Sequence, residues 1–307
     1  MSDAAGRIDV EGLTRELIDE ILWRGPGIRP GSVAAALVAP LIRKPLRRFS
    51  EIAVGFDERV AANGFHGALD WLLSHFAARI TVHGAENVPP SGPLLIASNH
   101  PGTCDAIAIA ASAPRDDVRI LAARIPFLDR LPATGENLLF TSPDREERRG
   151  AIWKAIQRLG AGGAVLMFPS GGLDPDPSCM PGAADDLDLW TPTVEVILRR
   201  VPATRLVPAV VSGVLLPRYV RHPLTRVRRK RRDRQRISEY LQVIRQMLVP
   251  GRLLVEPHIT FGQPMTIDEL NHAAPADGTT APIAWHARRV LASHLDTIAG
   301  DGSHSTR

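Results

Sequence analysis

Residues 93–105 read PLLIASNHPGTCD, and this stretch decides the fold class that we expect. Leu94 to Ala97 form a short apolar run typical of a buried strand, and Ala106 to Ala111 can form a helix after the Pro-Gly turn. Ligands bind at the carboxyl ends of strands in open α/β sheets, where the following helix offers unpaired N–H groups. We therefore predict an active site at this turn, with His100 and Asp105 as its reactive side chains.

The same alternation of short apolar runs and helical patterns continues along the chain. It predicts an α/β fold: a mixed, largely parallel sheet flanked by helices on both faces. The expected strands are 80–82, 94–97, 118–122, 137–141, 164–168, 206–211 and 253–261. The expected helices are 103–113, 145–159, 192–200, 234–248, 267–273 and 283–298.

Composition limits the class of protein. The chain has 307 residues, of which 44% are hydrophobic and 23% charged, as in an ordinary globular protein. The longest early apolar run, 33–42, is about half the ~20 residues that a spanning helix needs. Residues 1–9 lack the pattern of a signal peptide, so we expect a cytoplasmic protein. The two cysteines, Cys104 and Cys179, have no metal-ligand spacing, and no metal site is predicted.

Residues 1–77 are predicted to form an N-terminal amphipathic helical segment, followed by an α/β domain at 78–300 and a disordered tail at 301–307. Two interpretations of the first segment are compatible: it packs on the main domain, or it lies on a membrane surface. The second is favoured by the basic residues that follow the apolar run 33–42. They are Arg43, Lys44, Arg47 and Arg48.

Histidine can accept a proton from a hydroxyl near neutral pH, and a carboxylate can orient the ring and stabilise the imidazolium. A His followed five positions later by Asp, across a strand-to-helix turn, suits this pairing. No protein nucleophile is needed if the substrate supplies the hydroxyl, so the chemistry indicated is direct acyl transfer from a thioester. The spacing alone is weak, because it arises readily by chance.

Two further stretches give the spacing a context. Residues 165–172 read VLMFPSGG, and residues 206–211 read LVPAVV. In this order, the three stretches resemble the glycerolipid acyltransferase family, typified by glycerol-3-phosphate and lysophosphatidic acid acyltransferases, over residues 80–213. The resemblance implies a glycerol-3-phosphate acyltransferase-like fold, with His100 as general base and Asp105 as its orienting partner. It also implies that Asn99, Gly102 and Pro208 belong to the acyl-donor and oxyanion region.

The third motif of the family is Phe-Pro-Glu-Gly followed by Thr and Arg. Here Ser170, Gly172 and Leu173 replace the Glu, Thr and Arg, and Ser142 stands where the second motif of the family carries an Arg. Neither Leu nor Ser can replace an arginine as a phosphate ligand. Four acidic residues, Asp174, Asp176, Asp185 and Asp186, would also repel a phosphate. The identity of the acceptor therefore stays open. Arg124, Arg130 or Arg145 could still supply a cation that binds a phosphate. The resemblance assigns acceptor binding to Phe168, Pro169, Ser170, Gly171, Gly172 and Arg145.

Residues 218–236 form a dense basic run with Asp233 as its one acid. Few aromatic residues are interleaved, which argues against a nucleic-acid partner. A solvated loop, an anionic membrane contact, and attraction to acyl carrier protein or coenzyme A are the alternatives, and we favour the membrane. The residues predicted to contact it here are Arg228, Arg229, Lys230, Arg231 and Arg232.

The sequence thus predicts an acyltransferase peripherally associated with the inner face of the membrane. Its donor would be acyl-CoA or acyl-ACP, its acceptor a lysophospholipid or other lipid-like alcohol, and it would need no cofactor. A lipid-binding protein of the same fold without catalytic turnover is the rival. A hydrolase ranks last, because no Gly-x-Ser-x-Gly nucleophile motif is present.

Overall fold

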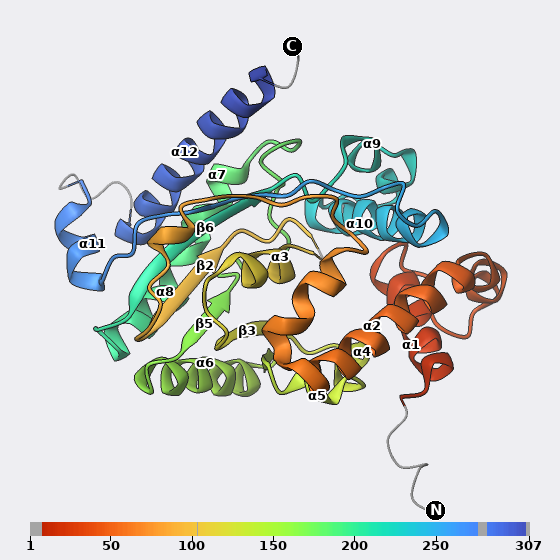
Figure 1. The fold of residues 1–307 in the computed structure, drawn as a ribbon. Coiled ribbons are helices and arrows are strands. Elements are labelled where there is room, and N and C mark those ends of the chain that lie inside the picture. Colours follow the sequence, from red (N-terminus) through yellow and green to blue (C-terminus); the bar gives the residue numbers. More distant parts are fainter. Residues whose placement is uncertain (1–7, 103, 276–280, 305–307) are drawn as a thin grey trace, which may run out of the picture. The chain divides into compact units, whose positions relative to one another are not determined.

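The computed structural model describes residues 8–102, 104–275 and 281–304. The chain divides into two compact units (Figure 1). The first combines residues 1–76 with 124–137 and 217–254, and the second combines 77–123, 138–216 and 255–307. The predicted N-terminal segment is therefore only part of a unit, because two later segments fold with it.

The second unit is built on one sheet. Among the described residues, seven strands pair in the order β1-β7-β6-β2-β5-β3-β4. Their bounds are β1 Thr81–His83, β2 Leu94–Ser98, β3 Val118–Ala123, β4 Leu138–Thr141, β5 Ala164–Met167, β6 Arg205–Ser212 and β7 His258–Phe261. All pairs are parallel except β6 with β7. The predicted mixed, largely parallel α/β fold is confirmed.

Helices cover this sheet. They are α3 Asp105–Ser112, α6 Arg145–Gly160, α7 Ala183–Asp186, η2 Leu187–Trp190, α8 Thr191–Arg200, α11 Ile267–Ala273 and α12 Pro282–His304, with η1 Ala85–Asn87. A core cluster joins Leu95 and Val165 of the central strands to Leu159 of α6, Ile197 of α8 and Val290 of α12. Because β2, β5 and β6 are buried along nearly their whole length, they read as continuous apolar runs.

The first unit is helical. It contains α1 Val10–Arg24, α2 Val33–Leu73, α4 Pro126–Asp129, α5 Pro132–Gly135, α9 Pro217–Val220, η3 Pro223–Val227 and α10 Arg231–Leu248. The apolar stripe of α1 packs with Leu46 and Val54 of α2 and Phe127 of α4. The 41 residues of α2 include Pro40 and Pro45, and Gly64 interrupts the helix with a φ of 77°. The helix continues past both prolines.

Three further predictions need correction. The basic run 218–236 is mostly helical, in α9, η3 and the start of α10, so the solvated loop that was one alternative for it does not describe its backbone. The strand predicted at 253–261 begins only at His258. The last helix continues to His304 and so enters the predicted tail; residues 305–307 lie outside the described residues.

Candidate active site

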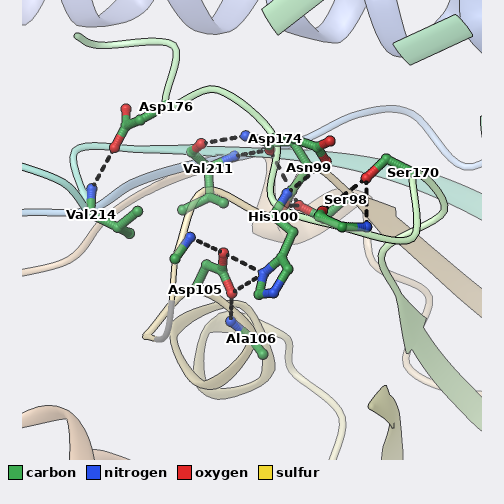
Figure 2. Close-up of polar contacts among 12 residues, drawn as sticks. Ser98, Asn99, His100, Asp105, Ala106, Ser170, Asp174, Asp176, Val211 and Val214 are labelled. Atoms are coloured by element: carbon green, nitrogen blue, oxygen red, sulfur yellow. Dashed lines mark hydrogen bonds and ion pairs between the residues drawn. The ribbon is translucent and has the colours of Figure 1, made fainter. Parts of the chain in front are cut away.

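The candidate site lies in the second unit, where β2 ends. The buried strand delivers Asn99 and His100 to its carboxyl end, and α3 begins five residues further on with Asp105. The His100 ring faces Asp105 (Figure 2), and Nδ1 lies 2.9 Å from Oδ2 and 3.1 Å from Oδ1 of the carboxylate. An ionised carboxylate only accepts hydrogen bonds, so Nδ1 carries the hydrogen and Nε2 is the nitrogen that can accept a proton.

Asp105 is held by the backbone around it. Its Oδ2 accepts from the Gly102 N–H at 2.9 Å, and its Oδ1 accepts from the Ala106 N–H. The carboxylate is fully buried, whereas 30% of the His100 side chain is exposed. Backbone donors at a helix N-terminus favour a negative charge there. The arrangement therefore fixes an anion behind the ring and leaves the ring within reach of a substrate.

The Gly102 contact corrects one prediction. Its N–H was expected to help stabilise an oxyanion, but it already donates to Asp105. The Gly171 N–H donates to Phe168 O at 3.1 Å, and the Gly172 N–H lies 3.4 Å from Ser170 Oγ. Each of these three N–H groups thus has a partner within the protein in this conformation, so none of them is an open oxyanion donor.

Asn99 joins two strands. Its Nδ2 donates to Val211 O, and its Oδ1 accepts from Val211 N, both at 2.8 Å. Val211 lies near the end of β6, next to β2 in the sheet, so the side chain extends the pairing beyond Ser98. These two bonds fix Asn99, and with it the start of the turn that carries His100.

The third motif lies beside the base. β5 neighbours β2, and after it the Phe168 ring stacks on the His100 ring with centroids 4.5 Å apart. Gly171 has a φ of 68°, which an L side chain rarely adopts, and this permits the turn at Phe168–Gly171. The Ser170 hydroxyl donates to Gly172 O at 3.0 Å. The predicted acceptor-binding turn is thus brought to His100.

Two other predicted site residues of the second unit lie elsewhere in that unit. Arg145 begins α6 after β4, which is separated from β2 by β5 and β3; three strand spacings are about 14 Å. Pro208 is buried within β6, opposite Ala97, and its carbonyl accepts from Gly262 N. Arg124 and Arg130 belong to the first unit, where they pair with Asp129 and Glu16.

The acidic loop after the third motif differs from expectation. Residues 173–176 are buried instead of lining an open loop, including Leu173 at the position where the family carries an arginine. Asp176 accepts from the N–H groups of Gly213, Val214 and Leu215 at 3.0 Å. Because its carboxylate is directed at backbone N–H groups, Asp176 fastens this loop to the end of β6 and does not face a substrate.

Asp174 was missed as a site residue. Its Oδ2 accepts from the His100 backbone N–H at 3.0 Å, and its own N–H donates to His100 O at 2.8 Å. Burial raises the pKa of this carboxyl to about 6, against the lowering effect of hydrogen bonds from Ser170 and His100. The sequence offered no signal for this contact beyond an aspartate in a Gly- and Pro-rich loop.

His294 was missed as well. On α12 it lies between two hydroxyls, with Nε2 2.8 Å from Ser212 Oγ and Nδ1 2.8 Å from Thr260 Oγ1. Burial, with a smaller effect of His258 and His83, lowers its pKa to about 4. The ring is therefore neutral at neutral pH, and one nitrogen donates while the other accepts. It supports the end of β6, next to Val211.

Comparison with known proteins bears on the family. Residues 79–211 match the protein-family model described as Acyltransferase. This segment is similar to the acyltransferase family. The match confirms the family predicted from the three motifs and spans all of them. A similar solved structure is the 1-acyl-sn-glycerophosphate (LPA) acyltransferase PlsC from Thermotoga maritima, with a TM-score of 0.45 and 13% identity over 94% of this chain and 96% of that chain. Among curated proteins, no sequence matches this chain.

Proposed function

We propose that this protein transfers a fatty acyl chain from acyl-CoA or acyl-ACP to a hydroxyl of a lysophospholipid or other lipid-like acceptor. The observation that supports this proposal most directly is the His100–Asp105 pair, with Nδ1 2.9 Å from Oδ2, inside the segment that matches the acyltransferase family. A buried carboxylate behind a partly exposed imidazole is an arrangement suited to general-base catalysis.

In the proposed reaction, His100 Nε2 accepts the proton of the acceptor hydroxyl as its oxygen attacks the thioester carbonyl. The new C–O bond forms a tetrahedral intermediate, which collapses by breaking the C–S bond. The imidazolium returns its proton to the leaving thiolate, and Asp105 stabilises the positive charge meanwhile. The products are an ester and a free thiol, and the steps need no metal or cofactor.

No residue of the protein is acylated in this proposal. The cysteines are poorly suited as nucleophiles: Cys104 is buried, and Cys179 Sγ lies 3.6 Å from Leu215 O. A direct transfer between two bound substrates is also consistent with the Phe168–Gly172 turn beside the base, where an acceptor would lie.

The departures in the third motif bear on the acceptor. The buried Leu173 cannot present a charge, and the Ser170 hydroxyl is bonded within its own turn. We propose that this turn positions the acceptor by shape and by contact with Phe168, and that any phosphate on the acceptor is bound elsewhere. Lysophospholipids and other hydroxylated lipids both fit this description.

The test is acyl transfer by purified protein. Palmitoyl-CoA and palmitoyl-ACP are offered with a panel of lysophospholipids and long-chain alcohols, and acylated products are measured by mass spectrometry. We expect an ester product from at least one acceptor, and a loss of roughly 10²–10⁴-fold in kcat for His100→Ala. Equal turnover by His100→Ala would reject the mechanism. Lipid binding without any transfer would favour the non-catalytic rival, and free fatty acid made without acceptor would favour a hydrolase.

We further propose that the first unit docks on an anionic bilayer. Within the described residues, no helix is both long and apolar enough to cross a membrane. At the start of α2, however, Val33, Leu37 and Leu41 are 79%, 70% and 76% exposed. Their spacing of four residues places them on one stripe of the helix. Exposed basic side chains follow directly: Arg43, Lys44, Arg47 and Arg48. Apolar and basic groups together suit anionic lipid.

The basic run contributes to the same proposal, with one correction. Arg228 donates through Nε to Gly25 O at 2.7 Å, so its role is to tie η3 to the connection between α1 and α2. Next to it, Leu224 and Val227 are more than half exposed, and Arg229 and Lys230 are exposed. Arg231 and Arg232 are partly buried. We therefore assign the membrane contact of this run to Leu224, Val227, Arg229 and Lys230.

Replacing the apolar stripe should detach the protein from vesicles. The Leu37→Asp/Leu41→Asp variant is expected to bind phosphatidylglycerol vesicles at least ~10-fold more weakly, because two leucines no longer enter the lipid. Co-sedimentation measures this binding, and Leu189→Asp, at an exposed leucine of the second unit, is the matched control. Unchanged binding by the double variant would show that the stripe is not the docking face.

A further inference from the structure

The backbone of His100 is held by one side chain from a distant part of the second unit. β2 ends at Ser98, so His100 lies beyond the strand pairing. Its N–H donates to Asp174 Oδ2 at 3.0 Å, and its carbonyl accepts from the Asp174 N–H at 2.8 Å (Figure 2). These reciprocal bonds join residues 74 positions apart and fix the peptide from which the catalytic ring extends.

The ring itself has two other supports. Asp105 binds Nδ1, and Phe168 stacks on the ring face. Neither of them restrains the backbone of His100. A general base must lie within hydrogen-bond reach of the proton it removes, and a displacement of about 1 Å can lower a rate ~100-fold. Control of the peptide therefore matters for catalysis as well as for folding.

The charge of Asp174 determines the strength of this support. The carboxyl is almost fully buried. Burial, together with a smaller effect of the Asp186 carboxyl of α7, raises its pKa to about 6, and the hydrogen bond from the His100 N–H opposes the change. Other titratable groups near this turn include His100, Asp105 and Asp176. An N–H bond to a carboxylate is roughly twice as strong as one to a neutral acceptor, so the contact weakens as Asp174 becomes protonated.

We propose that Asp174 is a positioning residue for His100, and that its ionised carboxylate keeps the backbone of His100 in the catalytic geometry. This inference rests on the proposed function, because it assumes that His100 is the base. It adds a second, pH-dependent requirement for activity: His100 must be neutral and Asp174 must be ionised.

The test compares the wild type with Asp174→Asn across pH 5 to 8, with palmitoyl-CoA and an acceptor that the wild type esterifies in the panel of lysophospholipids and long-chain alcohols. Asparagine resembles a protonated aspartic acid in shape and charge. At pH 8 we expect kcat of the variant to be roughly 10–100-fold lower, with little change in KM for palmitoyl-CoA. Near pH 5 the ratio of wild-type to variant kcat should be roughly 5–10-fold smaller than at pH 8, because about nine-tenths of Asp174 is then protonated in the wild type. A ratio of wild-type kcat to variant kcat that does not vary with pH would overturn the inference, and so would full activity of the variant at pH 8.

Control variants separate a failure of the Asp174 inference from a failure of the proposed function. Asp188→Asn changes an exposed carboxylate that pairs with Arg288, and it should leave the pH profile unchanged. An inactive His100→Ala together with a fully active Asp174→Asn would reject the inference while the proposed function stands. An active His100→Ala would reject the proposed function itself.

An NMR titration of the wild-type protein tests the same inference without relying on a variant that has to fold. The Asp174 carboxyl ¹³C and the His100 amide ¹H resonances should titrate with a common midpoint near pH 6. An Asp174 carboxyl whose titration leaves the His100 amide resonance unmoved would overturn the inference.

Discussion

Replacing Asp105 by Asn should lower kcat by roughly 10³–10⁴-fold without unfolding the protein. Oδ2 of Asp105 accepts from the Gly102 N–H and Oδ1 from the Ala106 N–H, so the NH₂ group of the introduced amide must replace one of these two acceptors, and either position lies within 3.1 Å of His100 Nδ1. Nδ1 would then have to accept a hydrogen bond, and the ring hydrogen would move to Nε2. An Nε2 that carries hydrogen cannot remove a proton from the acceptor.

Steady-state kinetics with palmitoyl-CoA measures this loss, and thermal unfolding checks the fold. Asp268→Asn, at an exposed position in the first turn of α11, is the control and should keep full activity. If Asp105→Asn retained kcat within about 3-fold, Asp105 would not orient the base.

Among the substitutions proposed for this protein, Asp176→Ala should lower the free energy of unfolding the most. The buried carboxylate accepts from the backbone N–H groups of Gly213, Val214 and Leu215 and from the Ser178 hydroxyl. Each buried donor left without a partner costs about 1–3 kcal/mol. We expect the free energy of unfolding to fall by about 3–5 kcal/mol, as measured by urea denaturation.

A matched control is Asp188→Ala, which removes an exposed carboxylate and its ion pair with Arg288. It should cost about 1 kcal/mol or less, because exposed ion pairs contribute little. Similar losses for the two variants would show that Asp176 does not fasten the loop to β6.

The main features of the second unit follow from short-range patterns. Buried parallel strands read as apolar runs, and helices between them read as amphipathic stretches, so the order of elements is visible along the chain. The His100–Asp105 pair is predictable for the same reason. Its members lie five residues apart across one turn, and the end of the strand and the start of the helix fix their distance.

The contacts that the sequence did not predict join distant residues. Asn99 bonds Val211 across 112 positions, and Asp174 bonds His100 across 74. A polar side chain in a Gly- and Pro-rich loop has the same local pattern whether it is solvated or buried against a strand end. Asp174 and Asp176 were therefore taken for exposed charges, and Gly102 for an open donor.

The first unit shows a different limit of prediction from the sequence. Packing of the apolar residues around Pro40 and Pro45 keeps α2 helical past both prolines, although Gly64 interrupts it later. In the sequence, Arg228 is one of many charges in a basic run, and we predicted a membrane contact for it. In the structure it donates a hydrogen bond to a carbonyl of the α1–α2 connection. Tertiary contacts override local propensity in both cases.

The central claim is that His100, oriented by Asp105, removes the proton of an acceptor hydroxyl during direct acyl transfer. Acyl transfer by the wild type, His100→Ala, Asp105→Asn and the His100→Ala/Asp105→Asn double variant tests it most directly. Residues that act as a unit give non-additive losses, so the double variant should be no slower than His100→Ala within about 3-fold. Transfer by His100→Ala at the wild-type rate, or losses that multiply in the double variant, would contradict the claim.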